Sequence, residues 1–306
     1  MGYTWGNFSG NNLGKYDLFL IKLNSDGEEQ WRKQWGTTEI DTGRSIVLNN
    51  NNIYIIGFTQ GSFTGFSNLG TQDIFLTKIK DNGNIQWTKQ WGTNGADRGN
   101  SIVVNDDSIY VTGSTDGYLG SDLDGNNLGH LDIFLTKLTL DGIKEWTKQW
   151  GTTENDAGNS ITIDNNHIYI TGLTEGTLSE CTSAGNSDIF LTKLALDGVK
   201  VWTKQWGTSS NDAGNSVIVL NNNIYVTGTQ INTADTFLTK IEDDGNILWT
   251  KHWGRNNNKN DSAMSITKDN SSNLYITGHT NGDFGDTPVG DFDAFLIKIT
   301  TINIEN

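Results

Sequence analysis

The stretch Trp-Thr-Lys-Gln-Trp-Gly-Thr at residues 87–93 decides the fold, because it recurs unchanged at 146–152 and 202–208. Close variants begin at Trp31 and Trp249, and the first tryptophans of the five copies are 56, 59, 56 and 47 residues apart. A period of this size indicates a repeat architecture. Ten of the eleven tryptophans belong to the motif, so its packing must explain most of the core.

Each repeat contains four apolar runs separated by Asn, Asp and Gly, as at residues 45–48, 53–57, 73–78 and 87–91. β-Branched and aromatic residues dominate these runs, which predicts strands rather than helices. Four short antiparallel strands per repeat are typical of one propeller blade. In the fourth strand a two-residue period places both motif tryptophans on one face, where they are expected to wedge one blade against the next.

The order of these motifs is similar to a known family. Residues 73–113 read Asp-Ile-Phe-Leu-Thr-Lys, Asp-Asn-Gly-Asn, Trp-Thr-Lys-Gln-Trp-Gly, Gly-Asn-Ser-Ile and Ile-Tyr-Val-Thr-Gly in succession. This pattern resembles the bacterial SBBP β-propeller repeat family across the whole chain. The resemblance implies a propeller and an extracellular or cell-surface setting, and it implies little about activity.

Counting strands leads to a prediction of five blades in a single propeller domain, residues 1–306. Complete repeats span about 41–93, 97–152, 156–208 and 212–255, and the terminal halves are 1–37 and 261–306. We expect the strands within 265–278 to pair with those within 17–35 in a closing blade shared by both termini. One third strand is then in surplus, either 17–23 or 293–299. Exchange of residues 17–23 or 293–306 between molecules would give dimers or fibres.

Composition narrows the function classes. The formal net charge of −15 argues against binding nucleic acid or an anionic membrane through a basic face. The sequence contains no apolar run of about 18 residues, which predicts no membrane span. The first residues lack the features of a signal peptide. Cys181 is the only cysteine, so an intrachain disulfide is excluded.

One face of the propeller is expected to carry the loops between second and third strands and between fourth and first strands. The loops between second and third strands vary in length. That at 229–234 is only six residues long, which predicts a gap in the wall. Variable loops on a rigid frame are typical of a binding surface. We predict a glycan or protein ligand there, contacted by Trp5, Glu39, Asp116, Tyr118, Glu154, Glu175 and Asp283.

Two further patterns have structural alternatives. An Asp recurs in every loop from fourth to first strand, and we interpret it as a turn cap rather than a ligand. Asp122, Asp124 and Asn126 have alternating oxygen ligands, as a calcium loop would, although a third acidic position and a distant Glu are missing. We expect no cofactor, with calcium at these three residues as the alternative.

No nucleophile motif or phosphate-binding loop is found, so we predict a binding or scaffold module rather than an enzyme. A structural subunit that assembles by strand exchange is the first alternative. A propeller glycosidase is the second, and it would need a pair of carboxylates. Glu39 and Glu154, at equivalent positions in two repeats, are the acids to test for it.

Overall fold

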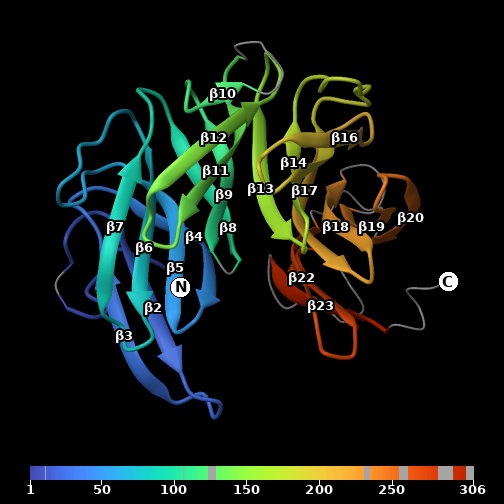
Figure 1. The fold of residues 1–306 in the computed structure, drawn as a ribbon. Coiled ribbons are helices and arrows are strands. Elements are labelled where there is room, and N and C mark those ends of the chain that lie inside the picture. Colours follow the sequence, from blue (N-terminus) through green and yellow to red (C-terminus); the bar gives the residue numbers. More distant parts are fainter. Residues whose placement is uncertain are drawn as a thin grey trace. The chain divides into compact units, whose positions relative to one another are not determined.

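The computed structural model describes residues 1–10, 12–105, 107–122, 129–230, 235–254, 261–281 and 292–300. Those residues form strands, turns and loops (Figure 1). The chain divides into two compact units, Met1–Trp150 and Gly151–Asn306, and each is built from consecutive sheets. Within the described ranges no helix is long and apolar enough to cross a membrane.

The first unit contains three sheets in chain order. The N-terminal sheet consists of β1 (Gly2–Thr4), β2 (Asp17–Leu23) and β3 (Glu29–Trp35). The second consists of β4 (Asp41–Asn49), β5 (Asn52–Thr59), β6 (Asp73–Lys80) and β7 (Ile85–Trp91). The third consists of β8 (Asp97–Val104), β9 (Ser108–Thr115), β10 (Ser121–Asp122), β11 (Asp132–Thr139) and β12 (Lys144–Trp150). Short β10 pairs in parallel with β12, and all other pairs are antiparallel.

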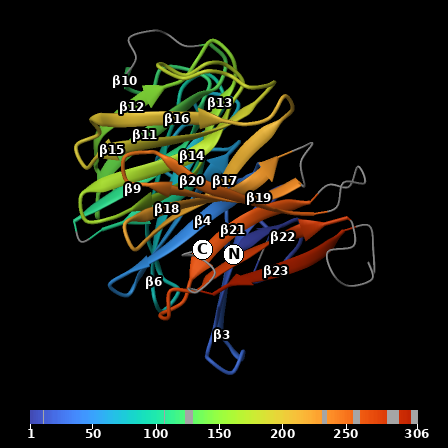
Figure 2. The ribbon, with the colours of Figure 1, turned by 90° about the vertical axis from the view of Figure 1, so that its right-hand side faces the viewer.

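The second unit also contains three sheets (Figure 2). The first consists of β13 (Asp156–Ile163), β14 (His167–Thr174), β15 (Asp188–Ala195) and β16 (Lys200–Trp206). The next consists of β17 (Asp212–Leu220), β18 (Asn223–Gln230), β19 (Asp235–Glu242) and β20 (Ile247–Trp253). The C-terminal sheet consists of β21 (Ser262–Lys268), β22 (Leu274–Thr280) and β23 (Asp293–Ile299).

The prediction of five blades is wrong, because the described strands form six blades. Sequence counting took residues 2–4 as the end of a second strand and did not count them, but they form β1, whose Thr4 pairs with Asp17 just as Thr59 pairs with Asp73 in the complete blade. The N-terminal segment therefore supplies a shortened second strand to its own sheet. Local pairing of this kind closes only a short loop, whereas the predicted shared blade requires pairing across the whole chain.

The prediction that one third strand is in surplus is wrong for the same reason. Strand β2 lies between β1 and β3, and β23 pairs with β22, so each of these third strands has a place in its own sheet. Self-assembly by exchange of residues 17–23 loses its basis with that correction. Residues 301–306 lie outside the described residues.

Within each unit the motif tryptophans pack against the next sheet, as predicted. Trp87 and Trp91 of β7 lie against a buried cluster that includes Ile102 and Val111 of the following sheet. The second tryptophan is fully buried in β12, where Trp150 is 1% exposed. These contacts explain why the motif recurs in each repeat, since every blade must present the same apolar face to its neighbour.

A polar contact also joins neighbouring blades, at the turn between third and fourth strands. In the first unit the indole N–H of Trp31 donates to the carbonyl of Asp81 at 2.9 Å, and the Lys22 ammonium binds the Asp81 carboxylate at 2.5 Å. In the second unit Trp202 and Lys193 make the same contacts with Asp243. A fourth-strand Trp and a third-strand Lys therefore hold the turn of the next blade in both units.

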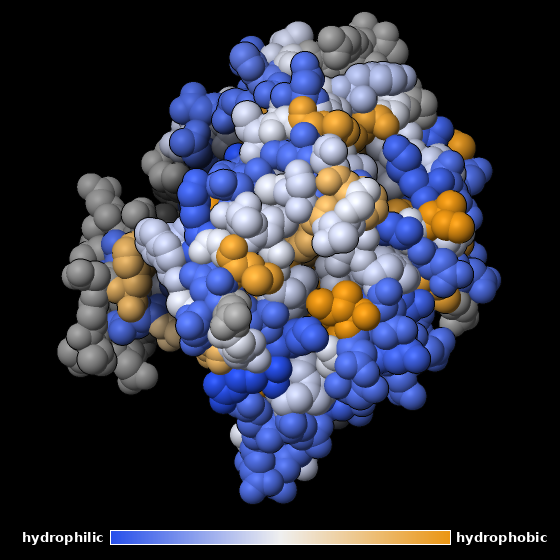
Figure 3. All heavy atoms as spheres, turned by 90° about the vertical axis from the view of Figure 1, so that its left-hand side faces the viewer, coloured by the Kyte–Doolittle hydropathy of each residue, from blue (hydrophilic) through white to orange (hydrophobic). Residues whose placement is uncertain are grey.

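Exposed apolar side chains lie scattered over the surface. Figure 3 shows one face of the molecule, on which hydrophobic residues form small separate patches among hydrophilic ones. Single exposed apolar residues are normal in a folded protein and carry no functional argument.

Candidate binding pocket

The glutamine of the tryptophan motif shapes the loop face. In β7 the Gln90 amide nitrogen donates to the carbonyl of Gly61 and to the Asp73 carboxylate, and its oxygen accepts from the Phe63 backbone. Gln205 makes the same three contacts with Gly176, Asp188 and Leu178. Each motif Gln therefore fixes the start of a long loop to the third strand of its blade.

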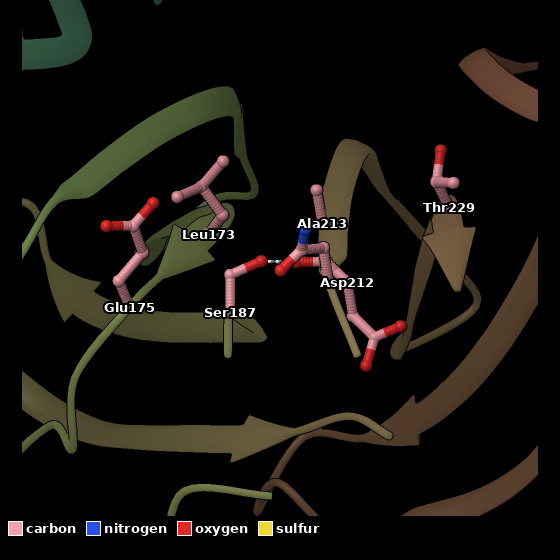
Figure 4. A pocket seen from close by; sticks show the side chains of 7 residues that line it. Leu173, Glu175, Ser187, Asp212, Ala213 and Thr229 are labelled. Carbon is pink, nitrogen blue, oxygen red and sulfur yellow. Dashed lines mark hydrogen bonds between the residues drawn. The ribbon is translucent and has the colours of Figure 1, made fainter. Parts of the chain in front are cut away.

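A pocket of about 290 Å³ lies on this face of the second unit, between the blades that begin with β13 and β17. Figure 4 shows Leu173 and Glu175 on one side, Ala213 and Thr229 on the other, and Ser187 between them. Thr229 lies near the end of β18, and the predicted loop beyond Gln230 lies outside the described residues, so the gap in the wall stays a prediction. Asn211 and Asp212 complete the lining.

Small side chains open this pocket, as comparison with the first unit shows. The bridge between Ser187 and Asn211 corresponds to that between Gln72 and Ala96, and Ala213 therefore corresponds to Arg98. Arg98 donates from Nε to the Gln72 side chain, and its guanidinium lies 5.9 Å from the centroid of the Phe58 ring. Arg98 and Gln72 thus fill a space between two blades of the first unit. Ala213 and Ser187 leave the equivalent space open in the second unit.

The acids of the pocket have different environments. Glu175 is exposed, and its carboxylate accepts a hydrogen bond of 2.7 Å from the Asn155 amide. Asp212 is 1% exposed, and its carboxylate accepts from the backbone N–H and the hydroxyl of Thr208. Figure 4 shows the Asp212 carboxylate turned away from Leu173 and Ala213. Glu175 is therefore the acid available to a ligand.

The buried loop aspartates are turn caps, which confirms that interpretation. Asp41, Asp97 and Asp156 each accept from the backbone N–H and the hydroxyl of the motif threonine four residues earlier. Burial raises the pKa of Asp41 and of Asp156 to about 6, and it also raises the pKa of Asp97. These side chains contribute to the frame and are not exposed to a ligand.

The predicted ligand residues of the first unit lie at its surface. Trp5 and Tyr118 are both 69% exposed. Glu39 forms an ion pair of 2.7 Å with Lys15. Asp116 lies exposed at the position equivalent to Glu175, and its backbone N–H donates to the carbonyl of Ala96. The Trp5 ring lies against Tyr16, whose backbone bridges to Ile40, whereas Asp116 and Tyr118 lie in a different loop.

Other predicted residues do not contribute to the pocket. Glu154 is exposed on the loop before β13, and Asp283 lies outside the described residues. Of the three residues predicted as alternative calcium ligands, only Asp122 is described, as backbone in β10. Asp124 and Asn126 lie outside the described ranges. Among the described residues, no group of three or more His, Cys, Asp or Glu side chains is placed to hold a metal ion.

Sequence reasoning identified Glu175 but missed Leu173, Ser187, Asn211, Ala213 and Thr229. Small or uncharged side chains carry no chemical signal of their own. A signal did exist in the repeat comparison, because Arg98 and Ala213 follow equivalent aspartates in otherwise similar loops. The same position holds Thr42, Ala157 and Ser262 in the other copies, so Arg98 is the large exception.

Residues 248–285 match the SBBP family, described as a beta-propeller repeat. The chain carries an SBBP beta-propeller repeat. The matched segment includes most of β20 and all of β21 and β22, so it crosses from the fourth strand of one blade into the next. The SBBP repeat and the six sheets agree on a propeller built from repeated four-strand units.

Two curated proteins resemble the chain. An uncharacterized WD repeat-containing protein of Acanthamoeba polyphaga mimivirus is 27% identical over 251 residues, covering 66% of this chain and 18% of that protein. The regulatory protein FlaEY of Caulobacter vibrioides is 22% identical over 171 residues, covering 51% of this chain and 18% of that protein. The chain thus spans less than a fifth of the length of these relatives.

Among solved structures, a neuraminidase-like protein of A/little yellow-shouldered bat aligns with a TM-score of 0.50 and 14% identity. The alignment covers 93% of this chain and 85% of that chain. At this identity the likeness concerns the fold alone, because one fold hosts unrelated functions.

Proposed function

We propose that the protein is a non-enzymatic binding module and that the pocket at Ala213 takes one sugar residue of a glycan. One observation carries the proposal. The small side chains of Ala213 and Ser187 leave a pocket between two blades, whereas Arg98 and Gln72 fill the equivalent space in the first unit. At this junction the repeated frame leaves a cavity on the loop face.

The chemistry of the lining favours a sugar. Leu173 and Ala213 offer an apolar surface to the C–H face of a pyranose ring, and Ser187, Asn211 and Thr229 offer hydroxyl and amide groups to its hydroxyls. The volume of about 290 Å³ is at the lower end of ligand sites, which suits a single sugar unit. The Glu175 carboxylate and the net charge of −15 disfavour acidic sugars.

The same lining favours binding over hydrolysis. A glycosidase generally places two carboxyl groups on either side of the bond that it cleaves. In this pocket Glu175 is exposed, whereas the Asp212 carboxylate is buried and occupied by Thr208. The pocket thus offers one carboxylate to a ligand, and that group suits a hydrogen bond to a sugar hydroxyl or amine.

A glycan array with neutral, amino and acidic sugars, followed by calorimetry, tests the proposal. We expect a neutral or amino glycan to bind, and Ala213→Arg to weaken its binding at least tenfold by filling the cavity. Val201→Arg adds the same charge on β16, which does not line the pocket, and should bind as the parent does. Absence of any glycan binding at millimolar concentration, unchanged binding by Ala213→Arg, or turnover of the bound glycan would overturn it.

A further inference from the structure

The blade junction in the first unit that includes Trp5 is the structural counterpart of the pocket. The pairing of Thr4 with Asp17 matches that of Thr174 with Asp188. Trp5 therefore occupies the position of Glu175 in the second unit. Likewise the bridge between Tyr16 and Ile40 matches that between Ser187 and Asn211.

Aromatic rings replace the open space at this junction. The Trp5 and Tyr16 ring centroids are 4.7 Å apart, with an interplanar angle of 49°. Tyr3 meets Tyr16 edge to face at 5.3 Å. Trp5 is nevertheless 69% exposed and Tyr3 is 54% exposed, so much of their ring surface stays open to solvent. We call Tyr3, Trp5 and Tyr16 the aromatic platform.

Hydrogen bonds fix the backbone of the aromatic platform on both sides of Trp5. The Gly6 N–H donates to the Thr4 hydroxyl at 3.2 Å, and the Asn12 amide donates to the Trp5 carbonyl at 2.9 Å. The motif glutamine Gln34 donates to the Gly6 carbonyl at 3.1 Å. An exposed indole held in this way is preorganised, which reduces the entropy lost when a ligand binds.

Charged residues flank the platform in sequence. Lys15 precedes Tyr16, Glu39 precedes Ile40, and the two charged side chains form an ion pair of 2.7 Å. The ammonium supplies donors and the carboxylate supplies acceptors, so together they match the hydroxyls of a sugar without favouring an acidic one. A pyranose ring can lay its C–H face on the exposed indole.

We infer that the aromatic platform is a second sugar-binding site, which takes one pyranose residue of a neutral glycan by stacking on Trp5. The inference rests on the proposed glycan-binding function, but it concerns residues that do not line the pocket at Ala213. It assigns a role to Trp5, the one tryptophan outside the repeated motif. The platform and the pocket are two forms of the same blade junction.

The test uses methyl glucoside, methyl galactoside and N-acetylglucosamine as probes, with saturation-transfer NMR and calorimetry on the whole chain. In an Ala213→Arg background, which fills the pocket, we expect one remaining site for a neutral sugar. Adding Trp5→Ala should weaken that site at least tenfold, whereas Trp5→Phe should retain most of it. Leu48→Ala is the matched control, because Leu48 is a large apolar side chain of nearly the same exposed fraction, 70%, on β4, and it belongs to neither the platform nor the pocket.

The outcomes separate the inference from the proposed function. If Ala213→Arg alone abolishes all sugar binding, the platform is excluded and the pocket stands. If sugar binding survives in Ala213→Arg and Trp5→Ala leaves it unchanged, the platform is likewise excluded. If none of the three probes nor any array glycan binds the parent, both ideas fail. Unchanged thermal unfolding of each variant is the check that a loss of binding is local.

Discussion

The motif glutamine couples the blade frame to the loop that begins beside it. Gln34, Gln90, Gln149 and Gln205 all bind a loop carbonyl and the Asp that opens the third strand. In the fifth copy of the motif, His252 takes this position, in the blade whose third strand begins soonest after its second, at Asp235 after Gln230. The glutamine thus occurs where a long connection is held, and its replacement accompanies the shortest one.

Replacing Gln90 with alanine should destabilise the protein by about 2–3 kcal/mol, because the amide is buried and binds the Asp73 carboxylate. Gln86→Ala, on the exposed side of the same strand, should change stability by less than about 0.5 kcal/mol. Urea unfolding of both variants measures the difference. Equal midpoints for the two would show that the loop contact contributes nothing.

At the scale of strands and turns, a glycine in the turn between third and fourth strands can lie close to the indole of the preceding blade. Gly142, in the turn between β11 and β12, has φ +74°, and a Cβ there would lie 2.8 Å from the ring of Trp87 in the preceding blade. Gly27 occupies the same kind of turn between β2 and β3 with φ +81°, but nothing lies within 4 Å of its Cβ position. The two glycines share a backbone conformation and differ in their surroundings.

Gly27→Ala should therefore cost about 1–2 kcal/mol, the strain of a left-handed residue. Gly142→Ala should cost at least about 1 kcal/mol more, because Trp87 must also move. The comparison, made by urea unfolding, isolates the packing of an indole against the next blade. Equal losses in the two variants would mean that this packing is loose enough to absorb a methyl group.

Much of this element-level structure was predictable from sequence. The four strand types, their order and the inward-facing tryptophans follow from periodicity, since packing between blades demands the same residues each time. The number of blades did not follow, because β1 has three residues and its pairing depends on register rather than on an apolar pattern. The hydrogen bonds of Gln90 could not be predicted from sequence either, because the partners of a buried amide are known only from the structure.

For the whole molecule, the buried turn-cap aspartates predict how stability depends on pH. Burial raises the pKa of Asp41 and of Asp156 to about 6, above the value of an unfolded carboxyl. The folded state then binds protons more tightly than the unfolded state. This contribution to stability is fully present below about pH 4 and is lost as the pH rises through about 6.

The urea midpoint should therefore increase when the pH is lowered from 7.5 to 5. Hydrogen bonds lower the pKa of Asp269 to about 2, and carboxyls of that kind oppose the trend only at more acidic pH. Asp156→Asn removes one titrating group and should flatten the increase. A midpoint that falls steadily between pH 7.5 and 5 would contradict the proton uptake inferred for these aspartates.

The candidate site was less predictable than the frame. Acidic and aromatic loop residues such as Glu175 and Trp5 were found from their chemistry and position. The cavity exists because Ala213 and Ser187 have smaller side chains than Arg98 and Gln72. The two pairs of residues are equivalent only through the strand register. Sequence shows the substitution, but only the paired strands show which volume it opens.

The most direct test of the central claim is a crystal structure of the protein soaked with the neutral or amino glycan that binds most tightly. The account predicts difference density for a sugar ring between Leu173 and Ala213, with its hydroxyls within hydrogen-bond distance of Ser187 or Glu175. A sugar found only elsewhere on the loop face, with the space at Ala213 occupied by solvent alone, would contradict it.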